Sequence, residues 1–121
     1  YQQVISRVNI FKSKSSKSSK YFYSAQKDLI KAYELQPENF DIASGLANLY
    51  FYKRDYSKSI KTLNKYLELT KDVSNHASIY VSIADAYGAS GNLIKACEFY
   101  SKSADLGNLK VYESKAFKNC K

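Results

Sequence analysis

Residues that interrupt helices are scarce in this chain, which has one proline and four glycines among 121 residues. Proline removes a backbone hydrogen-bond donor and glycine loosens the backbone, so their scarcity favours long helices joined by short turns. The sequence also lacks a run of the roughly 18 apolar residues that a transmembrane helix needs. No charged leader precedes an apolar core as in a signal peptide. We therefore expect helices and no membrane span.

Residue patterns that carry catalysis are missing as well. The only histidine, His76, lies in a polar connection, where we interpret it as a loop or helix-cap residue and not as a general base. The sequence has no glycine-rich phosphate loop and no nucleophile elbow. We therefore expect no enzyme activity, no cofactor and no metal ion.

Cysteine occurs twice, in a pattern that fits neither a zinc site nor a disulfide-rich scaffold. We expect Cys97 to be a buried free thiol and Cys120 to be exposed, with a bridge between them as the less favoured alternative. The chain contains no methionine and begins with Tyr1, so we expect it to be a processed or excised piece. Its location stays open, with the cytoplasm favoured.

Negative charge is in the minority, because 11 acidic residues stand against 19 Lys and Arg, for a formal net charge of +8. The lysines are spread along the sequence, which is typical of a solvated surface and makes nucleic-acid binding unlikely. Residues 12–20 contain only Lys and Ser, and we interpret them as a solvated, mobile loop. The functional alternative for this stretch is an anion contact or a phosphorylation site.

Two apolar stripes are present in residues 77–110. Residues three and four apart share one face of a helix, so each stripe predicts an amphipathic helix. The first stripe consists of Tyr80, Ile83, Ala84 and Tyr87, and the second of Leu93, Cys97, Tyr100 and Ala104, with Ala96 and Ser103 beside it. Between them lies Gly91, which can adopt a positive φ at a helix end. The pattern predicts an antiparallel helix hairpin that needs neighbours on both sides.

The same pattern occurs once more in residues 40–73, after Asn39 as a helix cap. Its small positions are filled by Ala47 and Ser59, and its second helix should run to about residue 70. Tyr66 departs from the pattern, because the neighbouring units carry Ala32 and Ser103 at that position. The spacing from Tyr50 to Tyr87 is 37 residues. We predict that the bulky tyrosine and this longer connection occur together and tilt the third hairpin.

A weaker unit precedes these two. Residues 1–12 carry Val4, Val8 and Phe11 at helical spacing, and helical periodicity returns from Tyr21 onward. Pro37 disfavours the helical conformation in the residue before it, so this second helix should stop near residue 35. At the other end of the chain, residues 109–120 predict a last helix whose inward residues are Val111, Tyr112, Ala116 and Phe117.

These offsets resemble the tetratricopeptide repeat, a helix–turn–helix unit of about 34 residues. The resemblance covers units 1–37, 40–73 and 77–110, and the stretch from Ala104 to Asn108 is similar to the end of a Sel1-like repeat. It implies an all-α fold in a single domain, residues 1–121. The expected architecture is a right-handed α-solenoid of about three antiparallel helix hairpins, closed by the helix 109–120 as a C-terminal cap.

The resemblance also implies a function, since the first helices of such repeats line a concave groove that holds a peptide or a partner protein. We expect the side chains opposite the buried stripes to form this groove: Asn9, Asp41, Gly45, Asn48, Tyr52, Ser78, Ser82, Asp85 and Ala89, with Gln2 and Ser6 in the first unit. Their amides suit a peptide backbone, and their two carboxylates favour a neutral or basic segment. The alternative is that these side chains merely face solvent.

The second helices suggest a competing site. Lysines recur on them at helical spacing: Lys27, Lys31, Lys58, Lys61, Lys65, Lys95 and Lys102. Gathered on the outer face, they would bind nucleic acid or an anionic surface, with a steep salt dependence. Self-association through an uncapped edge of the stack is a further alternative.

Overall fold

The computed structural model describes residues 18–118 and 120, and in this part of the chain it is all-helical, without strands. The long helices are α2 (Ser18–Leu35), α3 (Phe40–Tyr52), α4 (Tyr56–Leu69), α5 (His76–Ala89) and α6 (Leu93–Asp105). Three short pieces complete it: the 3-10 turns η1 (Val73–Asn75) and η2 (Leu109–Glu113), and α7 (Lys115–Lys118). The expected fold class is confirmed, while the helix predicted for residues 1–12 lies outside the described residues.

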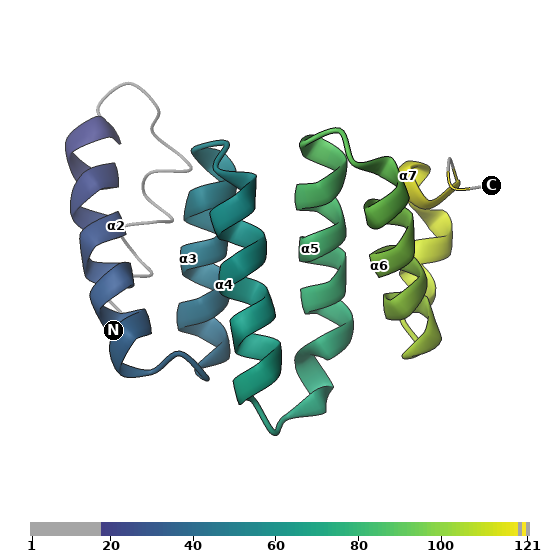
Figure 1. Cartoon of the computed structure of the whole chain (residues 1–121), viewed down its shortest axis with the longest axis horizontal. Helices are drawn as coiled ribbons and strands as arrows, with labels where there is room; N and C mark the ends of the chain where they lie inside the picture. The colour runs from purple at the N-terminus through teal and green to yellow at the C-terminus, as the bar shows by residue number, and fades with distance from the viewer. Residues whose placement is uncertain (1–17, 119, 121) are drawn as a thin grey trace.

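The helices stand side by side along the long axis of the molecule, with α2 at one end and the C-terminal segment at the other (Figure 1). Helices α3 and α4 pack as one hairpin and α5 and α6 as the next, while α2 packs on α3 and the terminal pieces pack on α6. Each element contacts its neighbours in the sequence, which is the arrangement of a solenoid.

Side-chain caps and left-handed residues set the helix ends. Asn39 accepts a hydrogen bond from the Ile42 nitrogen at 3.1 Å, and Asn92 caps α6 in the same way through Lys95. Gly91 has φ of 94°, as expected for a residue just past a helix end. The equivalent place in the α3–α4 turn is taken by Arg54, which adopts φ of 65° although it carries a side chain. The chain therefore reverses direction in both hairpins through the same type of turn, with a left-handed residue just past the end of the first helix.

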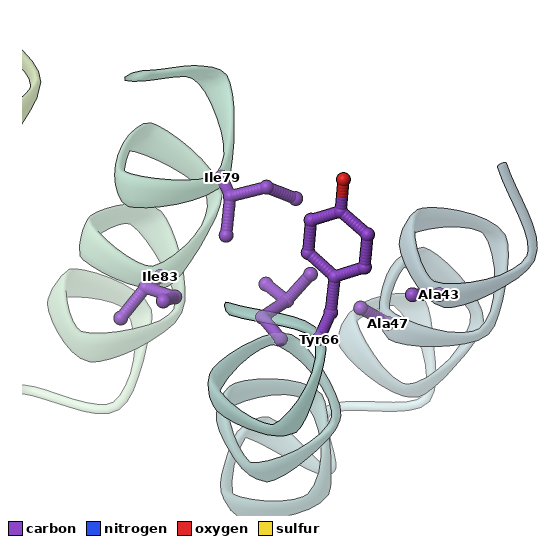
Figure 2. Packing of buried hydrophobic residues seen from close by; sticks show 6 residues of the cluster. Ala43, Ala47, Tyr66, Ile79 and Ile83 are labelled. Carbon is purple, nitrogen blue, oxygen red and sulfur yellow. The ribbon is translucent and has the colours of Figure 1, made fainter. Parts of the chain in front are cut away.

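The core between the two hairpins is built from small residues facing large ones. Tyr66 of α4 is 1% exposed, and Figure 2 shows its ring between Ile79 of α5 and Ala43 and Ala47 of α3. The Tyr66 hydroxyl accepts a hydrogen bond from Asn75 Nδ2 at 3.3 Å, so the bulky side chain and the longer connection are in contact. The tilt predicted for the third hairpin stays a prediction.

Helix α2 corrects the boundary of the Lys–Ser stretch. Ser18, Ser19 and Lys20 form its first turn, so the predicted loop 12–20 is wrong at its end. The helix stops at Leu35, as expected before Pro37. These three residues extend, at its N-terminal end, a helix that Ala25 and Leu29 anchor against α3.

The stripe of α6 also needs correction. Leu93, placed in the buried stripe by its spacing, is 66% exposed, whereas Ala96, Tyr100 and Ala104 are buried. Leu93 is the first residue of α6, where no preceding turn shields it. Phe99, which the predicted stripe leaves out, is partly buried against the core, and its ring stacks on Tyr87 at a centroid distance of 5.6 Å.

The predicted helix 109–120 is broken into η2 and α7. Ser114 adopts an extended conformation with ψ of 139°, and its Oγ accepts a hydrogen bond from the Phe117 nitrogen. This serine therefore ends one piece and caps the next. Val111 is buried as expected, but Tyr112 is 52% exposed. The side chain of Ala116 lies outside the described part of the chain.

The expectation for the cysteines was wrong. Cys97 and Cys120 form a disulfide, with their Cα atoms 5.5 Å apart across a sequence separation of 23 residues. The broken terminal segment makes this possible, because the change of direction at Ser114 brings the chain back to α6. A straight helix over residues 109–120 would not return in this way. The less favoured alternative is the one found.

Candidate functional site

A polar hollow opens where the first helices of the two hairpins approach each other. It has a volume of about 210 Å³ and is lined by α3, α4 and α5. Its residues are Ser44, Ala47, Asn48, Phe51, Tyr52, Ser59, Leu63, Ser82 and Asp85. Five of the nine side chains are serine, asparagine or aspartate, so this hollow offers mainly hydrogen-bonding groups.

A second, apolar hollow of about 410 Å³ lies next to it along α5 and α6. It is lined by Phe51, Asp85, Gly88, Ala89, Leu93, Ala96, Cys97 and Tyr100. Ligand pockets in proteins range from roughly 300 to 1,000 Å³, so the apolar hollow is large enough for a side chain of a partner. Phe51 and Asp85 line both hollows, and we call the two together the groove.

Asp85 lies at the junction of the two hollows and is held by Tyr100. The Tyr100 hydroxyl donates a hydrogen bond to Asp85 Oδ1. Burial raises the pKa of Tyr100 well above its usual range, and the hydrogen bond to Asp85 and its negative charge raise that pKa further. The tyrosine therefore keeps its proton and remains a donor across the physiological range.

The serines of the polar hollow already use their hydroxyl protons. Ser44 donates to the Asp41 carbonyl at 3.4 Å, Ser59 to the Ala47 carbonyl at 2.8 Å and Ser82 to the Ser78 carbonyl at 3.3 Å. Ser59 is buried, whereas the half-buried Ser44 and Ser82 can each still accept a hydrogen bond through their oxygen. The polar hollow therefore presents two serine oxygens as acceptors to a ligand.

Comparison with known families bears on the two hairpins that build this groove. The family model described as tetratricopeptide repeat matches residues 42–73 and 77–106, one hairpin in each match and together just over half of the chain. The chain belongs to the tetratricopeptide repeat family. Repeats of this family generally mediate protein–protein interactions, and the family is generally a non-catalytic scaffold. A comparison with curated proteins gives no match.

The matched tetratricopeptide repeats contain most of the residues predicted for the groove. Five of them line the hollows: Asn48, Tyr52, Ser82, Asp85 and Ala89. Asp41, Gly45 and Ser78 lie on the same helices but line neither hollow, and Asp41 and Ser78 belong to the first turns of α3 and α5. Asn9 falls outside the described residues.

Sequence reasoning missed groove residues that come from the second helix of a repeat. Leu93, Ala96, Cys97 and Tyr100 of α6 line the apolar hollow, and Phe51 lines both hollows from α3. The family pattern assigns the groove to first helices alone, so it places the α6 residues in the core, whereas Phe51 belongs to a first helix and is left out of the prediction for another reason, because it is not opposite the buried stripe. The available signal was the position of Leu93, since a leucine at the start of a helix has no preceding turn to cover it.

Other kinds of site are not found in the described part of this tetratricopeptide repeat chain. No group of three or more His, Cys, Asp or Glu could hold a metal ion there, and none of its helices is long and apolar enough to cross a membrane. His76 is the first residue of α5 and its ring packs against Tyr80, with centroids 6.2 Å apart. The histidine is thus part of a helix end. The Sel1-like resemblance near Asn108 stays a prediction.

Proposed function

We propose that this chain is a non-catalytic protein–protein interaction scaffold that holds a segment of a partner protein in the groove. One observation supports this above others: residues from the first helices of both matched repeats, α3 and α5, line a continuous pair of hollows that share Phe51 and Asp85. A segment lying in both hollows would contact both repeats at once. Such a shared surface is the usual basis of recognition in repeat proteins.

The exposure of the lining side chains supports the same proposal. Asn48 and Asp85 are exposed, and Tyr52 is also largely open to solvent. An asparagine amide offers both a donor and an acceptor, so it can pair with a peptide backbone whatever side chains the partner carries. The Asn48 amide and the Asp85 carboxylate can therefore be reached without any rearrangement of the helices.

No observation favours the alternative of a basic module that binds nucleic acid or an anionic surface. Several outer lysines already have local partners. Lys102 lies over the Phe99 ring at 4.6 Å, Lys65 over the Tyr33 ring at 5.7 Å, and Lys95 pairs with Glu98 at 3.6 Å. Packing on rings and ion pairing account for these lysines as ordinary surface residues.

Co-purification from the native source tests the proposal. Chain carrying Asn48→Arg and Asp85→Arg should lose a polypeptide that the unaltered chain retains, because both substitutions fill the groove and reverse its charge. A matched control with Lys61→Glu and Lys65→Glu on the outer face of α4 should keep that polypeptide. Loss in the control alone, together with retention on heparin that disappears at moderate salt, would support the basic-module alternative instead.

A further inference from the structure

The charge of the groove is opposite to that of the chain as a whole. Among the described residues that line the two hollows, Asp85 is the only Asp, Glu, Lys, Arg or His, in a protein of formal net charge +8. Within the described residues, no lysine or arginine forms an ion pair with it. The described lining of the groove therefore offers a ligand one carboxylate and no cationic side chain.

The hydrogen-bonding groups of the groove select the same kind of ligand. Tyr100 donates to Asp85 Oδ1, and the described residues place no hydrogen bond on Oδ2. Ser44 and Ser82 donate to carbonyls of their own helices, so their oxygens are left to accept, and the Asn48 amide can also accept through its oxygen. Acceptors clustered in this way suit a ligand rich in N–H donors, such as an ammonium or guanidinium group beside backbone amides.

The apolar hollow sets the second requirement. Leu93 is 66% exposed in its wall, next to Phe51, Ala89 and Ala96. Covering this leucine with an apolar group of a ligand is favourable, because it removes apolar surface from water. Because Asp85 also borders this hollow, the apolar group and the cation must be close together in the ligand.

From these observations we infer the partner class: a polypeptide segment that sets a Lys or Arg against Asp85 and places a neighbouring apolar side chain against Leu93. The inference rests on the proposed function and adds to it the chemistry of the partner. An acidic segment is disfavoured, because its carboxylates would face Asp85 without a cation between them. An uncharged apolar segment would fill the second hollow but leave Oδ2 without a donor.

A random heptapeptide library displayed on phage, selected against the whole disulfide-bonded chain, tests this inference. Selected peptides should carry Lys or Arg beside Leu, Ile, Met or Phe. Asp85→Asn should weaken their binding roughly tenfold, since a charge-assisted contact is lost while the asparagine oxygen can still accept from Tyr100. The matched control Asp105→Asn removes the same charge from an exposed residue at the end of α6, outside both hollows, and should leave affinity unchanged.

A second pair of variants locates the bound peptide. Leu93→Ser should weaken binding, whereas Ile94→Ser should not, because Ile94 is 85% exposed and lines neither hollow. Peptides that depend on Leu93 but are acidic, or that bind Asp85→Asn as well as the unaltered chain, would overturn the inferred partner class and leave the proposed function standing. A library that yields no Leu93-dependent peptide would overturn the proposed function itself.

Discussion

Tyr100 connects the core of the α5–α6 repeat to the surface of that repeat. Its ring packs among Ala84, Ala96 and Ala104, while its hydroxyl reaches Asp85 in the groove. Asp85 is thus oriented by a residue of the neighbouring helix and not by a residue of its own helix. A single buried tyrosine therefore orients the one charged side chain found in the described lining of the groove.

The raised pKa of Tyr100 predicts how stability depends on pH. A group whose pKa is higher in the folded state contributes stability that is fully present below its unfolded value, about 10 for tyrosine, and is lost as pH rises through the folded value. We expect the free energy of unfolding of the unaltered chain to fall above about pH 10 more steeply than that of Tyr100→Phe. Urea unfolding between about pH 9 and pH 11 measures this difference.

Ultraviolet titration of tyrosine provides the control. Asp85→Asn should bring the pKa of Tyr100 down but leave it above the usual value, because burial is the largest cause of the shift. A Tyr100 that titrates together with exposed tyrosines would contradict the packing described above.

At the scale of elements, the two hairpins show how much of the fold the sequence predicts. Helix bounds, the Asn39 cap and the turn at Gly91 follow from local patterns, and the structure confirms them. The sequence marks Tyr66 as a departure from the pattern, yet its hydrogen bond to Asn75 depends on how η1 lies against the end of α4. The same limit applies to Leu93, Phe99 and the hollows, because which side of a helix is covered depends on its neighbours.

The α3–α4 turn carries a strain that the α5–α6 turn avoids. Arg54 has φ of 65°, and the equivalent residue of the α5–α6 hairpin, Gly91, has φ of 94°. A left-handed conformation costs a residue with a side chain roughly 1–2 kcal/mol. Changing that residue to glycine removes this cost, but glycine also makes the unfolded chain more flexible, which offsets part of the stability recovered. Arg54→Gly should therefore raise the free energy of unfolding by about 0.5–1 kcal/mol in urea denaturation.

The reverse change should have the opposite effect. Gly91→Ala should lower the free energy of unfolding by about 1 kcal/mol, although no atom lies within 4 Å of the added Cβ. Arg54→Ala is the control for Arg54→Gly, because it removes the same side chain beyond Cβ but keeps the cost of φ at 65°. Equal effects of Arg54→Gly and Arg54→Ala would show that the turn holds no strain.

For the whole molecule, the end of the stack is closed by a covalent bond and not by the predicted long helix. The disulfide between Cys97 and Cys120 ties η2 and α7 to α6. Sequence reasoning set it aside because its pairing depends on a change of direction that no periodicity reveals. Structural disulfides persist in oxidising surroundings, so the bridge favours such a location over the cytoplasm.

Removal of this bond should weaken the stack from one end. Closing a loop of this length restricts the unfolded chain, so Cys120→Ser should lower the free energy of unfolding by about 3 kcal/mol. Because repeats are coupled mainly to their neighbours, hydrogen exchange should rise first in α6 and the terminal pieces. In a reducing buffer the unaltered chain and Cys120→Ser should become equally stable, and a difference that persists there would assign the effect to something other than the bond.

The position of the bridge has a practical consequence for testing whether the groove binds a ligand. Cys97 lines the apolar hollow, and the Cα of Cys120 is 5.5 Å from the Cα of Cys97. A dye or immobilising tag joined directly after Cys120 would thus be tethered beside the groove, where the dye's emission would report an occupant and a bulky tag would obstruct entry.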